Sequence, residues 1–140
     1  MTSRDAETLG DRFLKVDHAG EHGAVNIYRG QAWAARFTAP DLLPELREFH
    51  AHECGHRALF AAELQRRARR RCRSYALCGI GGWALGLITG LLGRGAIVAE
   101  ETEHHDRSAE RLSPDSWWMK TIAPIVSAST ETVIWLGMRL

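Results

Sequence analysis

The chain lacks the features shared by disulfide-stabilised, secreted and nucleic-acid-coating proteins. Its three cysteines, Cys54, Cys72 and Cys78, form no C-x-x-C pair, and their odd number argues against a disulfide framework. The N-terminal stretch MTSRDAETLGD has no apolar core of the kind that a secretory signal needs. Eighteen basic and seventeen acidic residues give a net charge of +1, which excludes a uniformly basic coat for nucleic acid. We therefore expect a reduced intracellular protein with no nucleic-acid partner.

Signals for β-structure are missing as well. No segment alternates apolar and polar residues, and no Asn-Gly or Asp-Gly turn occurs between apolar runs. Apolar residues recur instead at helical spacing, and 140 residues suit one domain, so we predict a single all-α domain over residues 1–140. The expected helices cover residues 11–36, 41–67, the apolar segment 76–93, 98–112 and 116–138.

One long segment has almost no charge. Residues 76–93 are uncharged, which reaches the minimum length of a membrane-spanning helix, but seven glycines lie between Gly79 and Gly95. Six of the eight residues just before it, 66–73, are arginine, which favours docking on an anionic membrane surface. A buried core helix and a true membrane span remain alternatives. The expected membrane contacts are Arg66, Arg67, Arg69, Arg70, Arg71, Arg73, Trp83, Leu87 and Leu91.

Two copies of the pattern E-x-x-H provide candidate metal ligands: Glu53 with His56, and Glu101 with His104. Residues three apart on a helix lie about 60° apart around its axis and one turn along, so each pair can reach one point. A carboxylate and an imidazole from each of two helices form the half-sites of a carboxylate-bridged di-iron centre, in which two further helices each give one glutamate. Glu21 is the candidate for the first of these. Ordinary charge on a helix surface is the alternative explanation.

The second helix also matches the zinc motif H-E-x-x-H through His52, Glu53 and His56. In that pattern the two histidines bind zinc and the glutamate activates water, with Glu100 or Glu101 as a possible third ligand. A zinc protease also needs a sheet edge for its substrate, and no strand is predicted. This interpretation leaves Glu21 and the second E-x-x-H without a role.

Taken together, residues 13–31 (FLKVDHAGEHGAVNIYRGQ), the HECGH helix, the ALGLITGLLG segment and EETEHHD resemble the Coq7 family of demethoxyubiquinone hydroxylases. The resemblance covers nearly the whole chain. It implies a ferritin-like helical bundle, peripheral attachment to the cytoplasmic face of the inner membrane, and two iron ions. It further implies hydroxylation of a polyprenyl quinol ring with O2 in ubiquinone biosynthesis, with NADH as an external reductant acting through the quinone. The iron ligands implied are Glu21, Glu53, His56, Glu101 and His104.

The chain departs from the family pattern after the apolar segment. Family members usually have more chain there, including a helix with a lone ligand glutamate, whereas here GRGAIVA runs directly into EETEHHD. A second alignment places EETEHH on that missing helix, so that the last E-x-x-H becomes the absent element. The bundle is thus expected to be shortened, with five ligands where six are needed.

Glu100 and Glu131 are the possible additional ligands. A second copy of the chain, or a lipid-binding Coq partner, is the other expected way to complete the bundle. The alternative function is that of a catalytically inactive homologue which binds quinone or lipid at the membrane.

Overall fold

The computed structural model describes residues 7–104, 132, 134–135 and 138, and for residues 101–104 it describes the backbone alone. The main elements are helix α1 (Leu9–Thr38), the 3₁₀ helix η1 (Pro40–Leu42), α2 (Leu43–Arg66), α3 (Tyr75–Leu92) and α4 (Arg94–His104). Residues 7–104 contain no strand, so the predicted all-α class is confirmed. Of the helix expected over 116–138, only 132, 134–135 and 138 are described, and these are helical.

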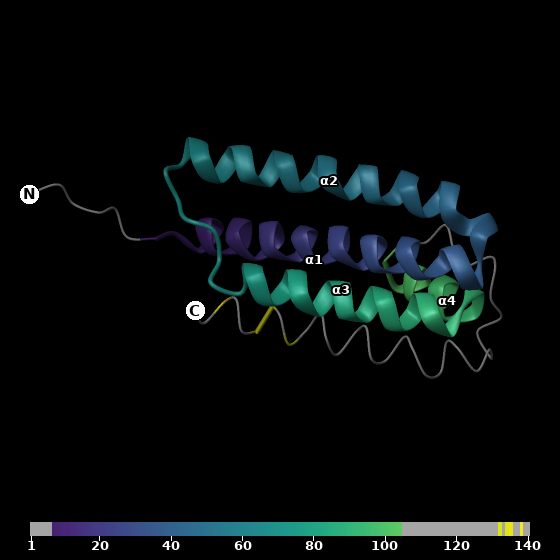
Figure 1. Ribbon diagram of the computed structural model, residues 1–140. Coiled ribbons are helices and arrows are strands. Elements are labelled where there is room, and N and C mark those ends of the chain that lie inside the picture. The colour runs from purple at the N-terminus through teal and green to yellow at the C-terminus, as the bar shows by residue number, and fades with distance from the viewer. Residues whose placement is uncertain (1–6, 105–131, 133, 136–137, 139–140) are drawn as a thin grey trace, which may run out of the picture.

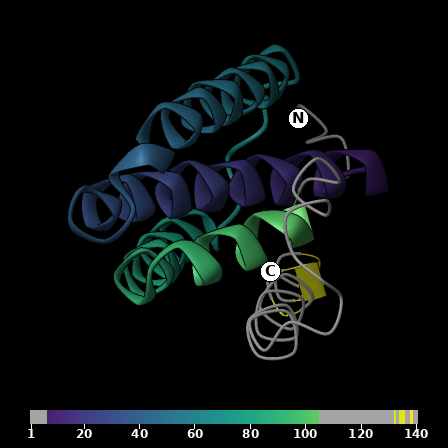
Figure 2. The same ribbon diagram turned by 90° about the vertical axis from the view of Figure 1, so that its right-hand side faces the viewer.

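Helix α1 lies in the middle of the bundle, between α2 and α3 (Figures 1 and 2). The turn at η1 sends α2 back antiparallel to α1, and the loop 67–74 then crosses α1 to begin α3. Helix α3 therefore runs in the same direction as α1, and α4 packs at the end of the bundle where α1 finishes (Figure 1). Because α2 and α3 both pack on α1, the residues on the two sides of α1 determine the composition of each interface.

Helix α1 begins two residues before the predicted start at Asp11. The Thr8 side chain accepts a hydrogen bond from the backbone of Asp11, and the Asp11 side chain accepts one from the backbone of Thr8, each at 3.1 Å. This reciprocal capping box satisfies amides that have no partner inside the helix. The sequence T-x-x-D at residues 8–11 is typical of such a capping box and therefore indicates a helix that begins at Leu9.

The glycines of the apolar segment form the contact between α1 and α3. A Cβ atom added to Gly30 of α1 would lie 2.6 Å from the Trp83 carbonyl oxygen and 2.6 Å from the Leu87 nitrogen. Likewise, a Cβ on Gly82 or Gly86 would collide with the backbone carbonyls of α1. The two backbones thus touch along a strip that admits no side chain, which is the packing that small residues permit between helices. This close contact explains how a glycine-rich helix is stable here.

The rest of α3 stays at the surface. Within the described ranges it is the one helix long and apolar enough to cross a membrane by length and composition, and 33% of it is buried inside the bundle. The alternative of a buried core helix therefore applies only to the side of α3 that carries the glycines packed on α1. The exposed side carries large apolar side chains, each at least 45% exposed: Leu77, Ile80, Trp83, Ile88, Leu91 and Leu92.

Helix α4 begins at Arg94, four residues before the predicted start at residue 98, so that boundary was wrong. Gly93 adopts a left-handed conformation (φ 94°) that ends α3 and lets the chain turn directly into α4. Ile97 and Val98 then bury themselves in the main hydrophobic cluster with Tyr28 and Leu46. The apolar residues after Gly93 therefore belong to α4 and fix it on α1 and α2.

Candidate metal centre

Two helices bring three of the predicted iron ligands together. Glu21 comes from α1, and Glu53 and His56 come from α2. The Nδ1 atom of His56 lies 3.4 Å from Glu53 Oε2 and 3.8 Å from Glu21 Oε1. These three side chains face one another across the α1–α2 contact, 32 residues apart in sequence between Glu21 and Glu53. A carboxylate-rich set with one imidazole suits a hard or borderline divalent metal ion.

Burial differs sharply among these groups. The Glu53 side chain is 8% exposed, whereas that of Glu21 is 22% exposed and that of His56 is 41% exposed. Glu53 is thus anchored in the interface while the other groups reach it from the more open side. His52, one turn before His56, approaches from the surface and places Nδ1 3.8 Å from Glu53 Oε1. The cluster is accessible to solvent and to a small ion.

His22 lies beside this cluster and joins three elements. Its ring stacks on Tyr75 of α3 with centroids 3.9 Å apart, and its Nδ1 lies 2.9 Å from Nη1 of Arg57 on α2. Because a guanidinium can only donate, the Nδ1 atom accepts, which requires a neutral ring. Burial lowers the pKa of His22, and the charge of Arg57 lowers it further. The roles of Arg57 and Tyr75 were not predicted from the sequence; the H-x-x-x-H spacing of His18 and His22 was the available signal.

Glu100 is not brought to this cluster. Its carboxylate is buried and accepts a hydrogen bond from Gln31 Nε2 at 2.8 Å, and the same nitrogen lies 3.1 Å from Thr89 Oγ1. Gln31 follows Glu21 by ten residues, which is about 15 Å along α1. The apolar residues 96–99 dock α4 at the far end of α1 and carry Glu100 there. Glu101 and His104 also lie in α4, but their side chains, like Glu131, are outside the described structure.

The arginine-rich loop divides into two groups. Arg66 and Arg67 bond to Glu63, and Arg67 and Arg69 pair with Asp11 at 3.2 and 3.0 Å. Hydrogen bonds from Arg66 and Arg67 lower the pKa of Glu63 to about 2. The sequence predicts membrane contact for all six arginines, yet these three are engaged in ion pairs: that of Arg66 lies within α2, and those of Arg67 and Arg69 with Asp11 hold the loop against α1.

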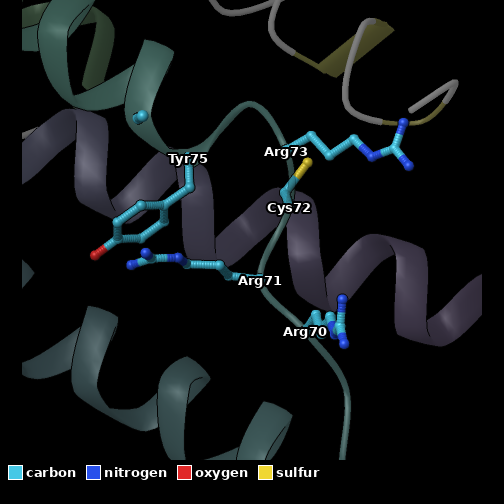
Figure 3. A pocket seen from close by; sticks show the side chains of 6 residues that line it. Arg70, Arg71, Cys72, Arg73 and Tyr75 are labelled. Atoms are coloured by element: carbon cyan, nitrogen blue, oxygen red, sulfur yellow. The ribbon is translucent and has the colours of Figure 1, made fainter.

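The remaining three, Arg70, Arg71 and Arg73, make no ion pair within the described residues. They line an open hollow of about 490 Å³ with Cys72, Tyr75 and Ala76 (Figure 3). The guanidinium of Arg71 lies 4.7 Å from the centre of the Tyr75 ring, whereas the side chain of Arg73 extends away from it (Figure 3). Of the predicted apolar contacts, Trp83 and Leu91 are exposed and Leu87 is half-buried. A cationic loop therefore adjoins the apolar face of α3.

Two glutamates and a histidine that meet between neighbouring helices are typical of helical bundles that bind metal through carboxylate and imidazole groups. The family model described as "Ubiquinone biosynthesis protein COQ7" matches residues 8–100, and the chain belongs to this family. The match includes α1, α2 and α3 entire.

Curated relatives point the same way. The chain is 39% identical over 120 residues to the 3-demethoxyubiquinol 3-hydroxylase of Rhodospirillum rubrum, covering 80% of this chain and 56% of that protein. It is 32% identical over 108 residues to the mitochondrial NADPH-dependent 3-demethoxyubiquinone 3-hydroxylase of Rattus norvegicus, covering 73% and 49%. It is 36% identical over 90 residues to the mitochondrial 5-demethoxyubiquinone hydroxylase of Saccharomyces cerevisiae, covering 64% and 38%. The chain spans about half the length of the curated relatives it matches.

Proposed function

We propose that this chain hydroxylates the ring of a demethoxy-ubiquinol at a di-iron centre. The convergence of Glu21, Glu53 and His56 between α1 and α2 is the observation that carries the proposal. Two carboxylates and an imidazole are the donor set that one half of a carboxylate-bridged iron pair requires. Glu101 and His104 of α4 are the proposed ligands of the other half, which requires that α4 in the iron-loaded protein leaves the position in which Gln31 holds Glu100 and carries them toward Glu21. The names of the relatives support the choice of substrate.

The protein residues have separate tasks in such a reaction. Glu21, Glu53 and His56 would hold iron, which when bound supplies the activation of O2. The neutral ring of His22, fixed by Arg57 and Tyr75, borders the cluster without adding positive charge of its own. One oxygen atom enters the ring C–H bond and the other leaves as water, so two electrons must come from an external reductant. NADH acting through the quinone is the proposed source.

A lipid-soluble substrate would reach the protein from the membrane. The proposed membrane contact consists of the apolar face of α3 and the loop arginines Arg70, Arg71 and Arg73. We place this face on an anionic membrane surface, because guanidinium groups beside apolar side chains favour that setting. A hollow of about 330 Å³ between α1 and α3 is lined by His22 and Asn26 of α1 and by Ile80 and Trp83 of α3, among others. It gives a quinol ring a path from the apolar face toward the neighbourhood of the cluster.

The membrane contact is tested with vesicles. Replacing Arg70, Arg71 and Arg73 by glutamine should weaken binding to vesicles that contain phosphatidylserine by about 1 kcal/mol per arginine. The matched control replaces Arg66 by glutamine, since that side chain is held by Glu63. An equal loss per replaced arginine in the two variants would show that the loop contributes only general charge.

The function is tested on the full chain reconstituted anaerobically with ferrous iron. Two irons per chain and hydroxylation of a short-tail demethoxy-ubiquinol are the expected results. Glu53→Ala should abolish both, whereas Glu48→Ala, an exposed carboxylate on the same helix, should change neither. A fully active Glu53→Ala variant would contradict the site. Two irons per dimer would assign the second half of the site to a partner copy.

The packing of Glu100 favours one second candidate, a quinone- or lipid-binding homologue without activity. Because Gln31, whose amide also bonds to Thr89, holds Glu100 about 15 Å from Glu21 along α1, that glutamate does not supply the missing ligand in this arrangement. Quinone binding without iron uptake in the same preparation would establish this candidate.

A further inference from the structure

We propose that His22 and Asn26 of α1 bind the oxygenated ring of the quinol, one as a hydrogen-bond donor and the other as an acceptor. Both residues line the hollow of about 330 Å³ between α1 and α3. The rest of its lining comes from α3 and carries no charge: Ala76, Gly79, Ile80 and Trp83. The inference rests on the proposed function for the choice of ligand, and it assigns contacts to two residues outside the proposed iron ligands.

Two contacts fix the imidazole of His22 in the wall of this hollow. Tyr75 stacks on the ring with centroids 3.9 Å apart, and Nη1 of Arg57 lies 2.9 Å from Nδ1. Because a guanidinium has no acceptor, Nδ1 accepts this hydrogen bond and the ring hydrogen is on Nε2. No acceptor within the described part of the chain bonds to Nε2. The N–H group at Nε2 is therefore a donor for a ligand.

Asn26 supplies the acceptor. This residue is 8% exposed, and its Nδ2 atom donates to the backbone oxygen of His22 at 2.8 Å. Because a carbonyl oxygen only accepts, this hydrogen bond fixes which end of the amide is the nitrogen. The Oδ1 atom accepts no hydrogen bond from the described residues. A buried amide oxygen without a donor is unfavourable, and a hydroxyl group of a ligand in the hollow would satisfy it.

Gly79 of α3 gives the imidazole its position. A Cβ atom at Gly79 would lie 2.4 Å from His22 Nε2 and 3.5 Å from Asn26 Nδ2. Any larger residue at position 79 would therefore displace the donor nitrogen. The close approach of the α3 backbone thus sets where His22 meets the hollow.

This lining matches a neutral quinol ring. His22 and Asn26 are one turn apart on one side of α1, so both can contact the same ring. A hydroxyl group can accept from the Nε2–H group and donate to Oδ1, whereas a quinone carbonyl can only accept. The side chains of Ile80 and Trp83, in residues that are 70% and 45% exposed, continue the lining onto the apolar face of α3, where the tail would lie. The volume is at the lower end for small-molecule sites and suits the head group alone. We therefore expect the hollow to prefer the quinol to the quinone.

The test is anaerobic calorimetry of the metal-free full chain in detergent micelles, with a decyl-tailed demethoxy-ubiquinol and its quinone as probes. We expect the quinol to bind about 5-fold more tightly, which is the effect of one additional hydrogen bond. Asn26→Leu removes the oxygen at similar side-chain size and should bring the two affinities together. Decylbenzene, which has the tail and no oxygen, should bind equally to the wild type and to Asn26→Leu. Equal affinities for quinol and quinone in the wild type, or a preference that Asn26→Leu retains, would overturn the inference.

Two glycines of α3 provide a matched pair of variants. Gly79→Ala should weaken quinol binding by about 5-fold or more, because the new methyl group displaces the His22 donor. Gly81→Ala should leave binding unchanged, since a Cβ atom there meets nothing within 4 Å. Equal losses in the two variants would contradict the inference. Circular dichroism of each variant verifies that the helices are retained.

The iron-loaded chain separates this inference from the proposed function. Asn26→Leu should raise the KM for the quinol by about 5-fold and leave kcat nearly unchanged, because the lost contact serves binding and not the oxidation. Hydroxylation with an unchanged KM in this variant would overturn the inference and leave the function standing. A wild-type chain that prefers the quinol but does not hydroxylate it would overturn the function and leave the inference standing.

Discussion

Helix α1 makes two contacts of opposite character. Toward α3 it presents Gly23 and Gly30, and the backbones of the two helices touch with no side chain between them. Toward α2 it presents Glu21, whose carboxylate meets Glu53 and His56. Close backbone contact at Gly30, Gly82 and Gly86 gains dispersion energy over many atoms and leaves no room for a ligand along that strip. The charged groups around Glu21 leave donor atoms that a ligand can use.

Along α1, the residues that hold the fold are therefore separate from those that offer donor atoms to a ligand. The α1–α3 face and the cluster around Tyr28 and Leu46 hold the fold. The α1–α2 face near Glu21 holds two carboxylates, Glu21 and Glu53, beside the imidazole of His56. Substitutions on the first face should therefore change the free energy of unfolding, and substitutions on the second should change metal binding.

The largest effect is expected on the α1–α3 face. Gly86→Val places side-chain atoms against the Ile27 carbonyl and should lower the free energy of unfolding by about 3 kcal/mol, as overpacking against a rigid backbone does. Gly81→Ala, on the open side of the same helix, should raise it by up to about 1 kcal/mol through helix propensity. Urea unfolding followed by circular dichroism measures both. Similar effects in the two variants would refute the backbone contact.

The second-largest effect is the gain in stability from a metal ion bound between α1 and α2. A metal ion at 100 times its dissociation constant should stabilise the wild-type chain by about 2.7 kcal/mol, because it binds the folded state. Glu53→Gln should remove this gain, since the carboxylate between the two histidines is lost. Without metal, the same variant should unfold at nearly the wild-type urea concentration. A large loss of stability in the metal-free variant would instead assign Glu53 a structural role.

Sequence patterns predicted the parts of this fold that depend on local spacing. The all-α class and the meeting of Glu53 with His56 follow from helical periodicity, because residues three apart share a face. The helix boundaries at residues 9 and 94 were missed, although T-x-x-D and Gly93 signal both. The capping residues, and not the apolar runs, set these two boundaries.

Partners set by tertiary packing could not be predicted. Nothing local indicates that Asp11 pairs with Arg67 and Arg69, which lie 56 and 58 residues away. The same applies to Glu100, which forms part of a charged run in the sequence but is fully buried against Gln31. Which face of a helix is buried depends on the position of its neighbours, and that information is distributed over the whole chain.

Glu100 provides a third, smaller test. Glu100→Ala removes the acceptor of the Gln31 hydrogen bond and leaves space in a buried region, so the free energy of unfolding should fall by about 2 kcal/mol. Metal content should stay at the wild-type level, because the cluster lies about 15 Å away along α1. Metal analysis beside urea unfolding gives both values. Reduced metal content in a folded Glu100→Ala protein would place this carboxylate in the centre after all.

The smallest effect concerns acid sensitivity at the end of the bundle where α3 begins. His18 is buried, and burial lowers its pKa, as do the charges of Arg57 on α2 and Arg71 in the loop. Its other close groups are the His22 and Tyr75 rings, so no acidic partner stabilises a proton there among the described contacts. With the folded pKa below the unfolded one, the unfolded chain takes up the proton first as the pH falls. Stability due to His18 should thus be full above about pH 6.5 and decrease below it. Urea midpoints between pH 7.5 and pH 5.5 should fall less steeply in His18→Gln, and equal slopes would show that another group controls the acid response.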